Sequence, residues 1–252
     1  MSAERNFFKR EWQLDVDMHP SGIADQLDAD YRLLAHVANH SAPATLRLWS
    51  SQSAVVVSQS EARLENYPQA VTALAHKGWQ VLARNTGGTA FAQTPEVLNV
   101  SAVCIVDKES PSIKECYENF CELLMDALEN LGLNATTGSQ ARAFCDGDYN
   151  ILIGEQKLVG TAQRWKRVAD QSSTAVLSQA AILVAIDTNE LCGVINEFYE
   201  VAGLKKIVYA DALIDLKTAL ERNKSSARNT FFSTELKRQL ADNIKHSFSL
   251  NQ

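Results

Sequence analysis

The sequence predicts a protein of the α/β or α+β class that folds as one domain. Segments with the two-residue period of strands interleave along the chain with segments that have the 3.6-residue period of helices. The 252 residues are 46% hydrophobic and 21% charged, which is the balance of an ordinary globular protein. A chain of this length buries a large core without disulfides or structural metal. We therefore expect a single domain over residues 1–252, with its core at about 23–215 and a helical extension at about 216–252.

The first part of the chain predicts two helices and four strands. In the first helix Leu27, Tyr31 and Leu34 recur at helical spacing, so we expect this helix to pack on a sheet. Pro68 suits the first turn of the second helix. The strands are runs rich in β-branched residues between polar turns. The helices are expected at 23–39 and 68–76, and the strands near 46–48 and at 54–57, 81–83 and 97–106.

The second part predicts a long helix, a hairpin and a further strand. The helix at 112–131 carries its apolar residues on one stripe and ends at Gly132. Gly154 and Glu155 suit a two-residue turn between hairpin strands, with glycine at its first position. The hairpin strands are expected at 149–153 and 156–164, the further strand at 175–186, shorter helices after it, and mobile segments at 224–226 and 243–252.

Composition excludes several classes of protein. No apolar run approaches the roughly 18 to 20 residues that cross a bilayer, and residues 1–17 mix charged and aromatic side chains, unlike a secretion signal. The five cysteines include no Cys-x-x-Cys pair, so we expect neither disulfides nor a metal site, and a cytoplasmic protein. The net charge of −6 argues against nucleic acid as the main partner.

A glycine-containing loop follows the strand at 81–83. It reads Arg84-Asn85-Thr86-Gly87-Gly88-Thr89, and paired glycines let a backbone approach a ligand closely. Taken alone, however, the loop is better explained as a hairpin turn between residues 81–83 and 89–92. Its spacing matches neither a phosphate-binding loop nor a dinucleotide fingerprint, so it predicts no nucleotide site.

Cys145 lies in a second loop, just before the predicted hairpin. A two-residue turn at 154–155 places Lys157 opposite Leu152, on the sheet face that also carries Asn150, Val159 and Thr161. A partly buried lysine there would polarise an acyl carbonyl and favour the thiolate form of a nearby cysteine.

The neighbouring charges leave the reactivity of Cys145 open. Asp146 and Asp148 would raise the pKa of the thiol, whereas Arg142, Lys157 and Arg164 could offset them, so Cys145 is either a nucleophile or an inert surface thiol. The chain has no Gly-x-Ser-x-Gly elbow and no well-placed histidine, which excludes a serine hydrolase and a cysteine protease.

Three ordered blocks between about residues 29 and 186 carry a family resemblance. The blocks are Leu46-Arg47-Leu48-Trp49; Arg84-Asn85-Thr86-Gly87-Gly88 followed by Leu98-Asn99-Val100-Ser101; and Phe144-Cys145-Asp146-Gly147-Asp148-Tyr149-Asn150 leading into Lys157-Leu158-Val159-Gly160-Thr161-Ala162-Gln163-Arg164. They resemble the lipoate-protein ligases, octanoyltransferases and biotin-protein ligases, and most closely the bacterial cysteine amidotransferases that move octanoyl groups onto lipoyl domains. The resemblance implies a mixed, largely antiparallel sheet with flanking helices.

The resemblance also implies roles for individual residues. Cys145 would be the nucleophile, and Lys157 would contact the acyl carbonyl. The family usually has Pro where this chain has Asp146, and Asp where it has Asn150. The acyl group would lie in a channel between the glycine loop and the Lys157 hairpin, bound by Arg84, Thr86, Gly87, Gly88, Asn150, Gly160 and Thr161.

The function that follows from the resemblance is transfer of an octanoyl or lipoyl group through a Cys145 thioester. The expected partners are a donor, either glycine cleavage H protein or acyl carrier protein, and acceptor lipoyl domains such as those of 2-oxoacid dehydrogenase acyltransferase subunits. No cofactor is expected. An ATP-dependent lipoate-protein ligase and a non-catalytic protein that binds acyl groups or lipoyl domains remain the alternatives.

Overall fold

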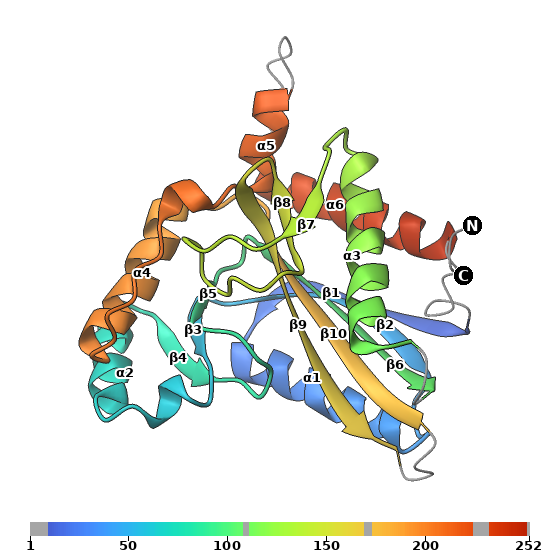
Figure 1. Ribbon diagram of the computed structural model, residues 1–252, viewed down its shortest axis with the longest axis horizontal. Helices are drawn as coiled ribbons and strands as arrows, with labels where there is room; N and C mark the ends of the chain where they lie inside the picture. The colour runs from blue at the N-terminus through green and yellow to red at the C-terminus, as the bar shows by residue number, and fades with distance from the viewer. Residues whose placement is uncertain (1–9, 108–110, 169–172, 224–231, 251–252) are drawn as a thin grey trace.

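A seven-stranded sheet forms the centre of the molecule. The computed structural model describes residues 10–107, 111–168, 173–223 and 232–250, and Figure 1 shows their arrangement. The strand order is β1-β2-β6-β10-β9-β8-β7, and every neighbouring pair is antiparallel except β1 and β2. The strands are β1 (Trp12–Ser21), β2 (Ala44–Ser51), β6 (Val97–Asp107), β7 (Thr136–Gly138), β8 (Asn150–Ile153), β9 (Gln156–Arg167) and β10 (Ser173–Leu183).

Helices flank this sheet, which confirms the mixed, largely antiparallel α+β fold. Each predicted helix and strand is found within a few residues of its expected bounds. The helices are α1 (Ile23–Ala38), α2 (Tyr67–Ala75), α3 (Ile113–Glu129), α4 (Thr188–Val201), α5 (Leu216–Asn223) and α6 (Ser233–Leu250), with short 3-10 turns at Glu61–Arg63 and Ala210–Ala212.

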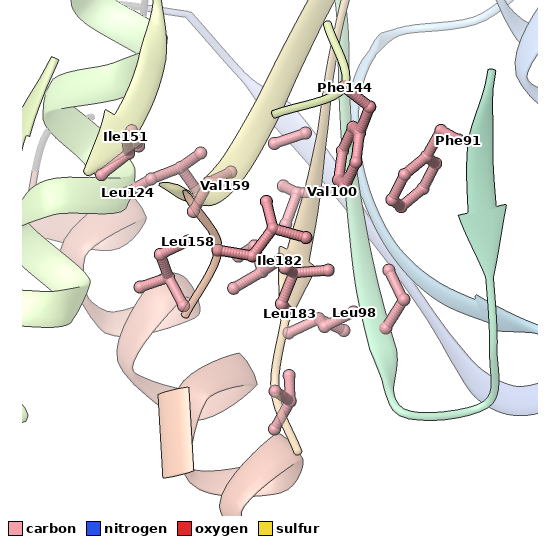
Figure 2. Packing of buried hydrophobic residues seen from close by; sticks show 14 of the residues in the cluster. Phe91, Leu98, Val100, Leu124, Phe144, Ile151, Leu158, Val159, Ile182 and Leu183 are labelled. Carbon is pink, nitrogen blue, oxygen red and sulfur yellow. The ribbon is translucent and has the colours of Figure 1, made fainter. Parts of the chain in front are cut away.

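The two faces of the main sheet pack against different helices. Side chains alternate along each strand, so neighbouring residues contribute to opposite faces. On one face Leu34 of α1 clusters with Val103 and Leu177. On the other face Val100 lies in the large core, to which α3 contributes Leu124 (Figure 2). Helix α6 contributes further side chains to this core. The face beneath α1 is the one that borders the site described below.

A second, smaller sheet lies beside α2 and α4. Its order is β4 (Gln80–Ala83), β3 (Ala54–Val57) and β5 (Phe91–Gln93). Because β3 lies between β4 and β5, a hairpin between residues 81–83 and 89–92 is wrong. β4 is parallel to β3 and β5 is antiparallel to it, so the glycine loop connects the two edges of this sheet.

Strand β1 precedes the predicted start of the core. Its apolar residues Trp12, Leu14, Val16 and Met18 alternate with polar ones, which is a strand signal that the sequence prediction missed. β1 has only β2 as a neighbour in the described sheet, and Leu14 and Val16 are 45% and 41% exposed. The strand therefore extends the sheet without burying much apolar surface.

Helix α6 corrects two expectations for the C-terminal part. It has 18 residues and is the longest helix described, so the prediction of only shorter helices is wrong. Residues 243–250 were predicted to be mobile, yet they belong to α6, and Ile244 and Phe248 are buried in the main core. Their spacing of four residues is helical. Residues 224–226 and 251–252 lie outside the described residues.

Candidate functional site

Cys145 lies in the loop between β7 and β8, with a backbone conformation that is rare for a residue with a side chain. Its φ is 48°, in the left-handed region. Three hydrogen bonds hold this conformation: its N–H donates to Thr89 Oγ1 (3.0 Å), and its carbonyl accepts from Asn150 Nδ2 (2.8 Å) and Lys157 Nζ (2.9 Å). The loop therefore fixes the direction of the thiol, as strained residues at functional sites often do.

The surroundings of Cys145 Sγ favour the thiolate. Thr89 N–H donates to Sγ (3.1 Å), and Arg84 Nη2 lies 3.5 Å from Sγ and also donates to Thr89 O (3.0 Å). Burial alone would raise the pKa of the thiol, but Arg84, Lys157 and the Thr89 donors outweigh burial and hold the pKa of Cys145 below its usual value. Of the cations considered from the sequence, Arg142 instead pairs with Asp211.

The other four cysteines are buried, and at Cys104 and Cys116 the effect of burial outweighs that of the nearby Arg10 cation. Burial raises the pKa of Cys104, Cys116 and Cys121 to about 12, and that of Cys192 to about 11. They are therefore structural residues. Cys145 is the one half-buried thiol among the five.

Gly88 permits the close approach of the glycine loop to Cys145. Its φ is +108°, and a Cβ at this position would lie 2.8 Å from Cys145 Sγ and would also collide with Arg84 Nη2. At Gly87 a Cβ would meet nothing within 4 Å. The two adjacent glycines therefore differ: contact requires glycine at 88 but not at 87.

Lys157 is fully buried, more deeply than the sequence predicted. Its Nζ donates to Phe144 O (2.6 Å) and Cys145 O (2.9 Å) and lies 4.4 Å from the centroid of the Phe144 ring. Burial lowers the pKa of Lys157 to about 8, partly offset by Cys145. An ammonium with this pKa can hold or release a proton near neutral pH.

The predicted alternation holds for Lys157 and Asn150 but fails for Val159 and Thr161, because the register between β8 and β9 shifts. Lys157 does pair with Leu152, but Val159 pairs with the adjacent Ile151. Gly160 then lies beside Lys157, where an added Cβ would be 3.3 Å from Nζ. A bulge of this kind moves a side chain to the other face of a strand.

A cavity opens beside Cys145, over the sheet face that α1 covers. It encloses about 570 Å³, a volume that includes space open to solvent. Phe91 and Phe144 face each other at its side, with ring centroids 4.8 Å apart (Figure 2). The cavity is lined by Leu27, Trp49, Val56, Arg84, Thr86, Phe91, Gln93, Asn99, Phe144, Cys145, Gly160, Thr161, Ala162, Gln179, Ala180 and Ala181.

The structure brings most of the predicted site residues together around this cavity. Cys145, Arg84, Thr86, Gly160 and Thr161 line it. Thr161 Oγ1, however, already donates to Tyr149 O (2.6 Å).

Four predicted residues do not line the cavity: Lys157, Asn150, Gly87 and Gly88. Lys157 and Gly88 nevertheless lie against Cys145. Asn150 Nδ2 donates to Cys145 O and Gly147 O, both at 2.8 Å, so Asn150 supports the cysteine loop.

The sequence prediction missed Thr89 and the two phenylalanines as site residues. Thr89 is next to the glycine pair, and Phe144 stands directly before Cys145, so both lie within one residue of predicted positions. Nothing in the sequence, beyond its place in a strand, indicated that Phe91 belongs to the site. Trp49 and Asn99 belong to the blocks that carry the resemblance, although no role was predicted for them.

The described residues contain neither a cluster of metal ligands nor a helix suited to crossing a membrane. No group of three or more His, Cys, Asp or Glu side chains in this part of the chain is arranged to hold a metal ion. None of the described helices combines the length and apolar character that crossing a membrane requires.

Known proteins share both the sequence pattern and the fold. The chain is 28% identical to octanoyl-[GcvH]:protein N-octanoyltransferases of Kyrpidia tusciae and Oceanobacillus iheyensis, over 75% and 74% of its length. These matches cover 66% and 64% of the relatives' own lengths, slightly under two thirds.

Solved structures confirm the fold. Lipoate-protein ligase A bound with ATP superposes with a TM-score of 0.70 at 17% identity, covering 96% of this chain and 85% of that one. A T. acidophilum protein with bound lipoic acid gives 0.69 at 18% identity, covering 96% and 86%. The model of the lipoyl protein ligase A/B catalytic domain matches residues 23–229, and the chain belongs to this family.

Proposed function

We propose that this protein is an acyltransferase that moves an octanoyl group between carrier proteins through a thioester on Cys145. The observation that carries the proposal is a thiol of lowered pKa at the edge of a cavity, between Arg84 and a buried Lys157. A thiolate is the nucleophilic form of cysteine, and this one adjoins a cavity whose lining includes the apolar side chains of Leu27, Phe91 and Phe144.

The proposed chemistry has two balanced steps. The Cys145 thiolate attacks the carbonyl carbon of an octanoylated lysine, a C–S bond forms, the C–N bond breaks, and the departing amine takes up a proton. The amine of an acceptor lysine then attacks the thioester, a C–N bond forms, the C–S bond breaks, the thiolate is restored and one proton is released. One amide replaces another, so the exchange needs no ATP.

Lys157 suits the proton transfer in both steps. Its pKa of about 8 lies near neutral pH, where a group can act as both acid and base. Its Nζ is anchored by the carbonyls of Phe144 and Cys145, which keeps it beside the backbone of the proposed nucleophile. It would protonate the departing amine and later accept the proton of the incoming one.

The relatives suggest the partners. The names of the octanoyltransferases specify octanoyl-[GcvH] as donor, and an archaeal ligase of this fold was solved as a system with its E2 lipoyl domain (TM-score 0.53, 17% identity). We propose octanoylated glycine cleavage H protein as donor and lipoyl domains of 2-oxoacid dehydrogenase acyltransferase subunits as acceptors. Acyl carrier protein is the other candidate donor, and the cytoplasm is the proposed location.

Intact mass spectrometry after incubation with octanoylated H protein, without ATP, tests the proposal. We expect the chain to gain one octanoyl group, which hydroxylamine removes and a lipoyl domain accepts. Cys145→Ala should show no adduct, whereas Cys192→Ala, at a buried thiol outside the site, should retain it. A parallel reaction supplies free octanoic acid, ATP and a lipoyl domain. Transfer in that reaction alone would indicate a ligase, and no acylation in either reaction would indicate a binding protein.

A further inference from the structure

Two rows of residues cross the sheet face beneath the cavity. The ladders place Trp49, Asn99, Ala181 and Gly160 in one row, and Arg47, Ser101, Gln179 and Ala162 in the next. Gly160 adjoins Lys157, so the first row lies at the reactive end. Members of the two rows are two residues apart along each strand, about 7 Å. Gln179 and Ala162 therefore line the cavity farther from the reactive lysine.

A buried ion pair lies behind the second row. Asp30 of α1 is fully buried and pairs with Arg47, which also donates to Gln26 Oε1 (2.8 Å) and to Asp15 Oδ2 (2.9 Å). Ser101 Oγ donates to Asp30 Oδ2 (2.6 Å). Breaking such a buried pair leaves an uncompensated charge, so the arrangement is costly to disturb.

This ion pair fixes two side chains that line the cavity. Gln179 Nε2 donates to Asp30 Oδ2 (2.6 Å), and Trp49 Nε1 donates to Ser101 Oγ (2.9 Å), which in turn binds Asp30. Gln179 and Trp49 can therefore not rotate away without losing a hydrogen bond to a buried group. The small side chains of Gly160, Ala162 and Ala181 leave open space in front of them.

We propose that Gln179, held by Asp30, forms the end wall of the acyl cavity and sets the longest acyl chain that the protein accepts. This inference rests on the proposed use of the cavity for an acyl group. Asp30 acts through Gln179 and is a positioning residue, whereas Gln179 would touch the end of the chain.

Free saturated fatty acids from hexanoic to tetradecanoic acid probe the cavity without a carrier protein or turnover. Each acid is titrated for its ability to protect Cys145 from iodoacetamide, with the modified protein quantified by intact mass. Wild type is compared with Gln179→Ala and Ala162→Leu, which lengthen and shorten the cavity. Gln163→Ala is the matched control, since Gln163 bonds Ser178 and does not line the cavity.

We expect Gln179→Ala to improve protection by the acid two methylene groups longer than the wild-type optimum about tenfold, since each buried CH₂ contributes roughly 0.8 kcal/mol. Ala162→Leu should move the optimum to shorter acids, and Gln163→Ala should leave it unchanged. An unchanged optimum in a folded Gln179→Ala would overturn the end wall while leaving the transferase intact. Protection that shifts as expected, without octanoyl transfer, would support the wall and refute the transferase. No protection of wild type by any acid would overturn the acyl cavity itself.

Discussion

At the scale of single residues, the reactivity of Cys145 depends on a balance between burial and nearby cations. Burial disfavours the thiolate, whereas Arg84, Lys157 and the Thr89 N–H favour it and prevail. Asp146 and Asp148 follow the cysteine in sequence, but sequence distance does not determine which charge acts most strongly. The glycine loop brings Arg84 to 3.5 Å from the sulfur.

Replacing Arg84 by Gln should raise the pKa of the Cys145 thiol. The cation favours the charged form, so its loss shifts the pH dependence of alkylation to higher pH and slows alkylation at neutral pH. The measurement is the rate of iodoacetamide modification across pH, followed by intact mass. Arg142→Gln, whose side chain pairs with Asp211, should leave the profile in place. Coincident profiles for Arg84→Gln and wild type would refute the assignment of Arg84.

Gly88→Ala should disable the site at modest cost in stability. The added Cβ would stand 2.8 Å from Sγ in a backbone conformation that alanine disfavours by about 1–2 kcal/mol. We expect thioester formation to slow about a hundredfold, because small displacements at a reacting centre have large effects. Gly87→Ala adds a Cβ with no neighbour within 4 Å and should react nearly as wild type. Equal losses in both variants would contradict the contact argument.

The sequence predicted part of the site and the structure supplies the rest. Cys145, Lys157 and Arg84 could be named from local blocks. Thr89 could not be recognised as the partner of Cys145, because that contact joins residues 56 apart and depends on β3 lying between β4 and β5. The sequence predicted Val159 on the sheet face of Lys157, whereas the structure places Gly160 there. A two-residue period along a strand does not reveal such a shift of register.

At the scale of elements, prediction succeeded where apolar periodicity is strong and failed where it is interrupted by charge. The apolar stripe of α3 and the β-branched residues of β3 and β6 were sufficient to predict these elements from the sequence. β1 has the period of a strand, but acidic residues separate its apolar ones. In α6 the apolar residues stand four apart within a polar segment, and only packing against α3 shows that they belong to the core.

Ile244→Ala in α6 should destabilise the protein by about 2–4 kcal/mol. Ile244 is fully buried, and its truncation leaves a cavity in the main core. His246→Ala, at an exposed position of the same helix, should change stability by less than about 0.5 kcal/mol. Urea unfolding measures both. Equal, small effects would indicate that this segment is not packed in solution.

At the scale of the whole molecule, the site is assembled from parts that do not touch in sequence. The small sheet supplies the glycine loop, the β7–β8 loop supplies Cys145, and β9 of the main sheet supplies Lys157. Folding must therefore enclose the Lys157 ammonium, which is fully buried and donates to two backbone carbonyls. This burial links the global stability to pH.

The free energy of unfolding should rise with pH because of Lys157. Its pKa is about 8 in the folded protein and 10.5 when unperturbed, so between these values the unfolded chain binds more protons and alkali favours the folded state. This difference in pKa corresponds to a gain of about 3 kcal/mol in the free energy of unfolding.

The test uses a Cys145→Ser background. The Cys145 thiolate raises the pKa of Lys157, so its removal lowers that pKa further and leaves the direction of the effect unchanged. Urea unfolding should then show a gain in stability from about pH 8 to about pH 10.5 relative to Lys157→Met in the same background. Parallel curves across this range would mean that the ammonium is not buried.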